Sequence, residues 1–219
     1  MREVETQVYV DLEGTAHHVG RLYTHIRSGR ERASLDYTPS WGEHEEAFPL
    51  APALSVDHGQ HHTRGDREIF APLTDSAPDR WGRRLIARRA RRAAREEERT
   101  PRTLYEIDYL LEVSDVSRQG ALRFAREEGG PFLADRGEEH VPPMVELPHL
   151  LRASDRVLAD EDTLEDLQLL FAPGSSLGGA RPKASVRGED GSLRIAKFPA
   201  RSDEWDVVRW EAVSLTLAR

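Results

Sequence analysis

Residues 175–198 read SSLGGARPKASVRGEDGSLRIAKF, and the assignment of fold and function begins from this stretch. It opens with a loop of small side chains that contains Gly178, Gly179 and Ala180. Glycine permits positive φ angles, and without a Cβ the backbone N–H groups can approach phosphate oxygens. Two short alternating segments then surround a turn at 188–191. The pattern predicts a phosphate-binding loop, a strand, a tight turn and a second strand, although a glycine pair is also common in ordinary connections.

Lys197 lies near the end of the second expected strand. Because side chains alternate along a strand, Leu193, Ile195 and Lys197 share one face. An ammonium group on an apolar face is costly unless it has a partner or a ligand. A protein kinase places a lysine on its third strand to hold the α- and β-phosphates of ATP. The alternative is an edge-strand lysine that discourages aggregation.

Glu211 lies within the helical pattern that follows this strand after a short loop. In a protein kinase, a glutamate of the next helix pairs with the strand lysine and fixes its ammonium over the phosphates. Trp210, Ala212 and Val213 surround Glu211 and reduce its expected contact with water. Taken alone, an ordinary surface glutamate is the simpler interpretation. The order of loop, lysine and glutamate together favours a nucleotide site.

In the rest of the chain, alternation and turn residues predict strands, and helical patterns and cap residues predict helices. The expected strands are a hairpin over 7–22 about Glu13-Gly14, a third strand at 33–37 and a short one at 120–124. One expected helix starts with Asp75 or Ser76 as its N-cap and Pro78 in its first turn. The other expected helices cover 104–113, 147–156, 163–171 with Asp162 as N-cap, and 204–219.

Composition excludes several classes of function. The 219 residues contain no cysteine, so a disulfide framework and a cysteine zinc site are excluded. No run approaches the roughly 20 apolar residues that span a bilayer, so we expect a cytoplasmic protein without membrane contact. The net charge of −8 argues against nucleic acid as the main partner of the whole chain. His61 and His62 follow Asp57 and His58 closely in the sequence, but no further metal ligand lies at helical or hairpin spacing. No metal site is therefore predicted.

Several motifs together resemble the HipA family of serine/threonine kinases. The loop SLGGARPK at 176–183 is similar to the family's phosphate loop, S-x-x-G-A-x-x-K. The segment DSAPDRWGRRL at 75–85 resembles its D-S-L-P-D-x-W-G-R-R-L motif, and GALRF at 120–124 resembles its G-A-L-x-F strand. Residues 35–41, LDYTPSW, and the following PLAPALSV at 49–56 resemble its amino-terminal subdomain. The likeness covers nearly the whole chain, with the motifs in the family's order.

The resemblance implies roles for individual residues. Ser176 corresponds to an inactivating autophosphorylation serine, and Glu211 to the helix glutamate. The residues implied in ATP binding are Gly178, Gly179, Ala180, Lys183, Lys197 and Glu211. ATP and Mg²⁺ are the implied cofactors of the complete kinase. The implied partners are a HipB-like DNA-binding antitoxin and a protein substrate, with the kinase as toxin of a toxin–antitoxin pair.

We therefore expect an α+β protein with two parts. Residues 1–139 are assigned to a β-rich HipA amino-terminal subdomain, and 140–219 to the start of a kinase-like small lobe. The catalytic aspartate, its asparagine and the metal-binding aspartate of a kinase would follow later in the sequence. No catalytic residue is therefore assigned within this chain, which is expected to be a truncated kinase that is inactive alone.

Two alternatives to the kinase remain open. The first is a non-catalytic, truncated or split HipA-like binding module that serves as an antitoxin or scaffold. The second is direct contact with DNA through the segment 80–99, which contains nine arginines. We favour a solvated helix over contact with DNA, because Glu96, Glu97 and Glu98 of the segment can pair with its arginines.

Overall fold

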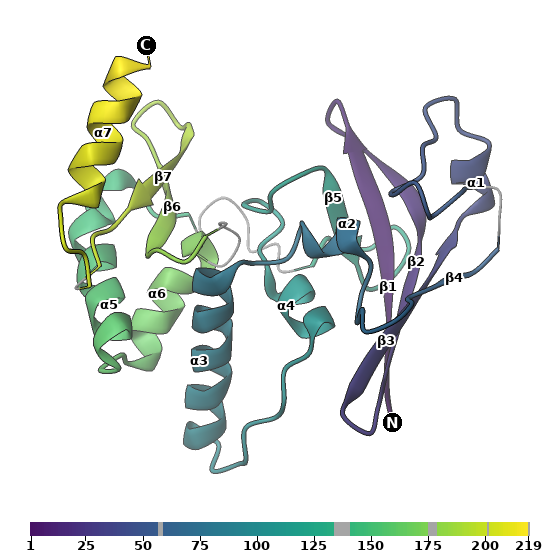
Figure 1. Ribbon diagram of the computed structural model, residues 1–219, viewed down its shortest axis with the longest axis horizontal. Coiled ribbons are helices and arrows are strands. Elements are labelled where there is room, and N and C mark those ends of the chain that lie inside the picture. Colours follow the sequence, from purple (N-terminus) through teal and green to yellow (C-terminus); the bar gives the residue numbers. More distant parts are fainter. Residues whose placement is uncertain (57–58, 134–140, 175–178, 201, 219) are drawn as a thin grey trace. The chain divides into compact units, whose positions relative to one another are not determined.

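The computed structural model describes residues 1–56, 59–133, 141–174, 179–200 and 202–218. The fold is α+β, as predicted from the sequence. The chain divides into two compact units, each of which is described by itself (Figure 1). Unit 1 consists of Met1–Pro78 and Leu104–Asp135, and unit 2 consists of Asp79–Thr103 and Arg136–Arg219.

Unit 1 is built on an antiparallel sheet with the strand order β4-β3-β2-β1-β5. Its strands are β1 (Arg2–Leu12), β2 (Thr15–Arg27), β3 (Arg30–Tyr37), β4 (His61–His62) and β5 (Leu122–Ala125). The predicted strands at 33–37 and 120–124 correspond to β3 and β5. The segment 41–65 contributes the end of a short helix and the two residues of β4.

Two tight turns join the three long strands of unit 1. Glu13 (φ 51°) and Gly14 (φ 85°) connect β1 to β2, and Ser28 (φ 50°) and Gly29 (φ 76°) connect β2 to β3. Positive φ angles at both central positions are typical of the turn that best matches the twist of paired strands. The predicted hairpin about Glu13-Gly14 is confirmed, and its strands extend beyond the expected range 7–22.

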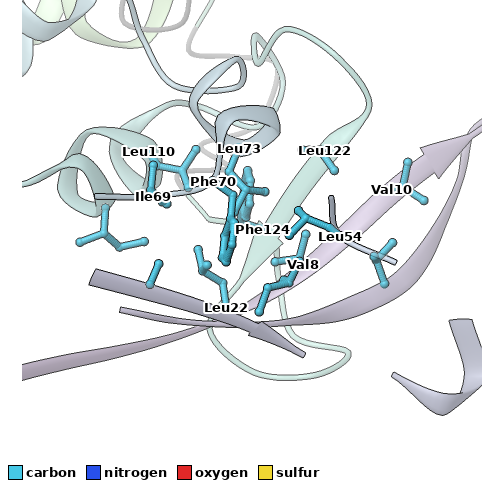
Figure 2. Close-up of a cluster of buried hydrophobic side chains, with 14 of the residues drawn as sticks. Val8, Val10, Leu22, Leu54, Ile69, Phe70, Leu73, Leu110, Leu122 and Phe124 are labelled. Carbon is cyan, nitrogen blue, oxygen red and sulfur yellow. The ribbon is translucent and has the colours of Figure 1, made fainter. Parts of the chain in front are cut away.

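One face of this sheet is covered by apolar side chains from short helices and loops. The helices of unit 1 are α1 (Pro39–Gly42), α2 (Ala71–Thr74) and α4 (Glu106–Glu112). Figure 2 shows Val8, Leu22 and Phe124 of the strands beside Leu73 of α2 and Leu110 of α4. All five are at most 2 % exposed, and their burial supplies the main stabilising term of this unit.

Unit 2 consists of helices packed against a two-stranded hairpin. Helix α6 contacts α3, α5 and β6, so it lies at the centre of the unit. The elements are α3 (Arg80–Glu96), η2 (Met144–Glu146), α5 (Leu147–Ala159), α6 (Leu164–Gly174), β6 (Lys183–Arg187), β7 (Leu193–Lys197) and α7 (Val207–Leu217). Trp81, Leu85, Leu150, Leu167 and Ala184 are among the buried residues of its core.

The predicted start of the arginine-rich helix is wrong. Asp75 is the C-cap of α2, and Ser76 and Pro78 lie between the helices. Helix α3 begins after Asp79, which occupies its N-cap position. The chain therefore makes a short helix at 71–74 before α3, which the pattern of cap residues alone did not separate from it.

The predicted N-cap of α6 is also wrong. Thr163 and Asp166 exchange hydrogen bonds between side chain and backbone N–H, at 3.2 Å and 2.9 Å, in the manner of a capping box. Asp162, the expected cap, forms ion pairs with Arg88 and Arg92 of α3 instead. A carboxylate that meets two guanidinium groups gains more than one that meets a single backbone N–H.

The two units differ from the predicted parts 1–139 and 140–219 mainly in one segment, and the later boundary falls after Asp135. Asp79–Thr103, which contains the arginine-rich helix, belongs to unit 2. The physical reason is its buried face, because Trp81 and Leu85 of α3 are members of the core of unit 2. The chain thus crosses from one unit to the other more than once.

Candidate functional site

The register of the β6–β7 hairpin brings two lysines together. Lys183 at the start of β6 is the direct partner of Lys197 at the end of β7. Directly opposed residues of an antiparallel pair project from the same face, so both ammonium groups lie on one side of the hairpin. Lys183 and Lys197 are the only two lysines in the sequence. Like charges in directly opposed positions are destabilising unless neighbouring anions compensate them.

Lys197 forms an ion pair with Glu211 of α7. The loop between β7 and α7 therefore returns the helix to the end of the strand, as the sequence predicted. Lys197 does not lie on a buried apolar face, however, because Leu193 and Ile195 are 50 % and 54 % exposed. The ammonium that is taken from water is that of Lys183, a residue only 7 % exposed.

Lys183 lies in a field of opposed charges. Burial lowers its pKa from the ordinary value, and the positive charge of Lys197 lowers this pKa further. The carboxylates of Asp79 and Glu211 act on the same pKa in the opposite direction. A desolvated cation beside a second cation interacts strongly with any anion that reaches it. These groups can therefore bind an anionic ligand.

Gly179 lies directly against the ammonium of Lys183. Its φ angle is +93°, a conformation that residues with side chains rarely adopt. A Cβ at this position would lie 2.7 Å from the Nζ atom of Lys183. The backbone conformation therefore favours glycine, and a residue with a Cβ would displace the flexible end of Lys183. Ala180 follows in the same segment and is exposed.

The first residues of α3 hold this segment in place. The backbone N–H of Gly179 donates to Oδ2 of Asp79 at 2.6 Å, and its carbonyl oxygen accepts from the N–H of Trp81 at 3.2 Å. The indole N–H of Trp81 donates to the carbonyl oxygen of Lys183 at 2.9 Å. Asp79 and Trp81 were not predicted as site residues. The signal that could have found them is the motif DSAPDRWGRRL, which contains both.

A second contact connects the segment after the loop with the approach to α7. Arg181 forms an ion pair with Asp203 through both terminal nitrogens. Asp203 also accepts the backbone N–H of Ala200 at 2.9 Å. This pair fixes the chain between Lys197 and Glu211 to the chain just before Lys183. Sequence reasoning missed both residues, because nothing local to either one indicates its partner.

The structure thus brings together Gly179, Ala180, Lys183, Lys197 and Glu211 of the predicted residues. Ser176 and Gly178 lie outside the described residues. Within the described residues, no group of three or more histidine, aspartate or glutamate side chains could hold a metal ion. No helix in that part of the chain is long and apolar enough to cross a membrane.

Comparison with known families finds a match for the amino-terminal part of the chain. A family model described as the HipA N-terminal domain matches residues 10–104. The matched range contains the sheet strands β2 to β4 and only the last three residues of β1. It ends before the lysine hairpin. No curated protein matches the chain.

Proposed function

Residues 10–104 make this chain a HipA-family protein, and from this premise we propose that unit 2 binds the phosphates of ATP as part of a HipA-like serine/threonine kinase. The parent reaction is phosphoryl transfer from ATP·Mg²⁺ to a hydroxyl group of a protein substrate. Lys183, Lys197, Gly179 and Ala180 are the proposed phosphate contacts. Glu211 orients Lys197, and Gly178, outside the described residues, is assigned by resemblance.

The observation that carries this proposal is the opposed pair Lys183–Lys197 with Glu211 beside it. Two ammonium groups on one face of a hairpin form a site for a ligand with several negative charges. A triphosphate carries enough negative charge to pair with both ammonium groups at once, whereas a single carboxylate does not. The pairing of Lys197 with Glu211 agrees with the way in which kinases orient their strand lysine.

ATP binding by the 219-residue chain tests the proposal directly. We expect Lys197→Met to weaken binding of Mg·ATP by about tenfold to a hundredfold, because it removes a charge-assisted contact. Arg194→Met is the matched control, since Arg194 is a cation of the same strand that contacts Asp190 and Ser192 at the far end of the hairpin. Isothermal titration calorimetry gives both affinities. Equal affinity of Lys197→Met and wild type would contradict the proposal.

The wider role follows from the family. We propose that the complete kinase acts in the cytoplasm as the toxin of a toxin–antitoxin pair, with a HipB-like DNA-binding antitoxin as partner. Ser176, which lies outside the described residues, is the proposed autophosphorylation site. A phosphate there adds about −1.5 to −2 charge three residues before Gly179 in the sequence, so we expect Ser176→Asp to weaken ATP binding.

A non-catalytic HipA-like module, serving as antitoxin or scaffold, is the alternative to the kinase. Binding of Mg·ATP distinguishes the two, because a module without a nucleotide role would not bind it, and transfer of radiolabelled phosphate from ATP to protein by the purified chain is measured beside it. We expect nucleotide binding without transfer from these residues alone. Labelled product would show that the chain is itself a complete enzyme.

A second candidate function is contact with nucleic acid phosphates through α3. A hollow of about 230 Å³ is lined by four arginines and two aspartates, namely Arg88, Arg91, Arg92, Arg95, Asp160 and Asp162. Within the described residues, Arg91 and Arg95 form no ion pair, whereas Arg88 and Arg92 pair with Asp162. The excess of positive charge favours an anion with repeated phosphates.

The salt dependence of binding to a DNA duplex tests this second candidate. We expect the double variant Arg91→Ala/Arg95→Ala to reduce the slope of log K against log salt by about 2, close to one counterion per lost contact. The double variant Arg30→Ala/Arg194→Ala removes the same charge elsewhere and is the control. Equal slopes for the two double variants would exclude a role of the α3 hollow.

A further inference from the structure

Both backbone polar groups of Gly179, its N–H and its carbonyl oxygen, form hydrogen bonds with residues at the start of α3. Asp79 accepts its N–H at 2.6 Å, and the N–H of Trp81 donates to its carbonyl oxygen at 3.2 Å. Trp81 then holds the carbonyl oxygen of Lys183 through its indole N–H at 2.9 Å. The start of the helix is therefore hydrogen-bonded to a segment about 100 residues later in the chain.

These contacts lie beside the ammonium of Lys183. A Cβ added at Gly179 would lie 2.7 Å from the Nζ atom of Lys183, so the ammonium lies close to this residue and the conformation of Gly179 affects the space that the ammonium occupies. The carboxylate of Asp79 also acts electrostatically on Lys183, against the opposing effects of burial and of Lys197. Asp79 thus bears on Lys183 through both geometry and charge.

The carboxylate of Asp79 does not cap the helix that Asp79 precedes. An aspartate at an N-cap normally accepts a backbone N–H from the first turn. Asp79 occupies this position in α3 but makes no such hydrogen bond. Its carboxylate is directed to Gly179 instead. Helix capping therefore does not explain the aspartate, and loss of its side chain removes no cap bond from α3.

We infer that Asp79 is a positioning residue of the nucleotide site, which holds Gly179 so that Lys183 can contact a phosphate group. The inference rests on the proposed function and adds a residue that lies about 100 positions before the phosphate loop. Asp79 itself does not contact the nucleotide. It acts through the Gly179 peptide, and its negative charge close to a phosphate weakens binding slightly while its hydrogen bond strengthens it.

Two substitutions in the full chain separate the hydrogen bond from the charge. Asp79→Ala removes both, and we expect Mg·ATP to bind about tenfold more weakly. Asp79→Asn keeps an oxygen that accepts the Gly179 N–H and loses the charge, so its affinity equals or exceeds that of wild type. The melting temperatures of both variants are measured as well. If these are equal, a difference in Mg·ATP affinity between Asp79→Ala and Asp79→Asn cannot come from a role of Asp79 in folding alone.

The matched control is Asp190→Ala. Asp190 accepts a backbone N–H, that of Ser192, at 3.1 Å in the exposed turn at the other end of the hairpin. We expect this variant to bind Mg·ATP as wild type does. Hydrogen exchange of the Gly179 amide, followed by NMR, gives a reading that needs no nucleotide. Protection is expected in wild type and Asp79→Asn, and its loss in Asp79→Ala.

The outcomes are distinct. If Asp79→Ala binds Mg·ATP as tightly as wild type, the inference is overturned. If it binds more tightly, Asp79 competes with the phosphate and does not position the loop, which also overturns the inference. If the wild-type chain binds no Mg·ATP, the proposed function fails and takes the nucleotide role of Asp79 with it. The exchange of the Gly179 amide then decides separately whether Asp79 holds the segment.

Discussion

At the scale of single residues, the two lysines differ in the way that matters most for the site. Lys183 is buried and lies against Gly179, whereas Lys197 is partly exposed and paired with Glu211. Sequence reasoning expected the buried ammonium at Lys197. Alternation along β7 predicted its face correctly but could not show that Leu193 and Ile195 on this face are exposed.

Gly179→Ala tests the position of Lys183. Alanine at a φ angle of +93° is strained, and its Cβ forces the flexible end of Lys183 to move. We expect the free energy of unfolding to fall by about 1–2 kcal/mol, mostly from the backbone. Binding of Mg·ATP should also weaken, because the ammonium is displaced.

Gly191→Ala is the control for this prediction. Gly191 has a φ angle of +77°, but nothing lies within 4 Å of the Cβ that alanine would add. Both variants should therefore lose similar stability in urea unfolding, and only Gly179→Ala should lose affinity for Mg·ATP. Equal affinities would show that the ammonium of Lys183 is not a phosphate contact.

At the scale of the elements, charged side chains fix the helices of unit 2 to one another. Asp162 joins the chain before α6 to α3 through Arg88 and Arg92. Asp166 at the start of α6 pairs with Arg156 near the end of α5. The helical patterns of the sequence predicted these helices, but the sequence did not indicate which charges would meet.

Asp166→Ala tests the second of these connections. The variant loses the bond to the Thr163 N–H and the pair with Arg156, so we expect the free energy of unfolding to fall by about 1–3 kcal/mol. Glu165→Ala is the control, because Glu165 is the exposed neighbour on the same helix and should change stability by less than about 0.5 kcal/mol. Similar losses in the two variants would contradict the prediction.

The connection through Asp166 should also depend on pH. Hydrogen bonds from Arg156 hold the pKa of Asp166 below its ordinary value of 3.8. A carboxyl with a lowered pKa in the folded state stabilises the fold above 3.8, and this contribution is lost as the pH falls through the folded value. The difference in stability between wild type and Asp166→Ala, measured by urea unfolding, should therefore shrink as the pH falls below 3.8.

At the scale of the whole molecule, each unit has a core of its own. The core around Phe124 contains residues of unit 1, and the core around Leu170 contains residues of unit 2. The sequence predicted two parts, but it placed the arginine-rich helix in the first. The helix belongs to unit 2 because Trp81 and Leu85 are buried in the second core.

Core variants test whether the two units are separate units of stability. Phe124→Ala should cost about 3–5 kcal/mol, because it opens a cavity at a fully buried ring. In native-state hydrogen exchange we expect faster exchange in β1, β2 and β5, and unchanged exchange in β6 and β7. Leu170→Ala should produce the reverse. Acceleration in both units by either variant would show that they unfold together.

The sequence by itself determined what short-range chemistry controls. Positive-φ turns, strand alternation and the order of loop, lysine and glutamate are local, and so the hairpins, β3, β5 and the pair Lys197–Glu211 could be predicted. Only the tertiary structure decided which lysine is buried and which unit holds α3. It also decided that Asp79 and Trp81 form hydrogen bonds with Gly179 and Lys183. These features depend on hydrogen bonds and packing contacts between residues about 100 positions apart, which no local sequence pattern can indicate.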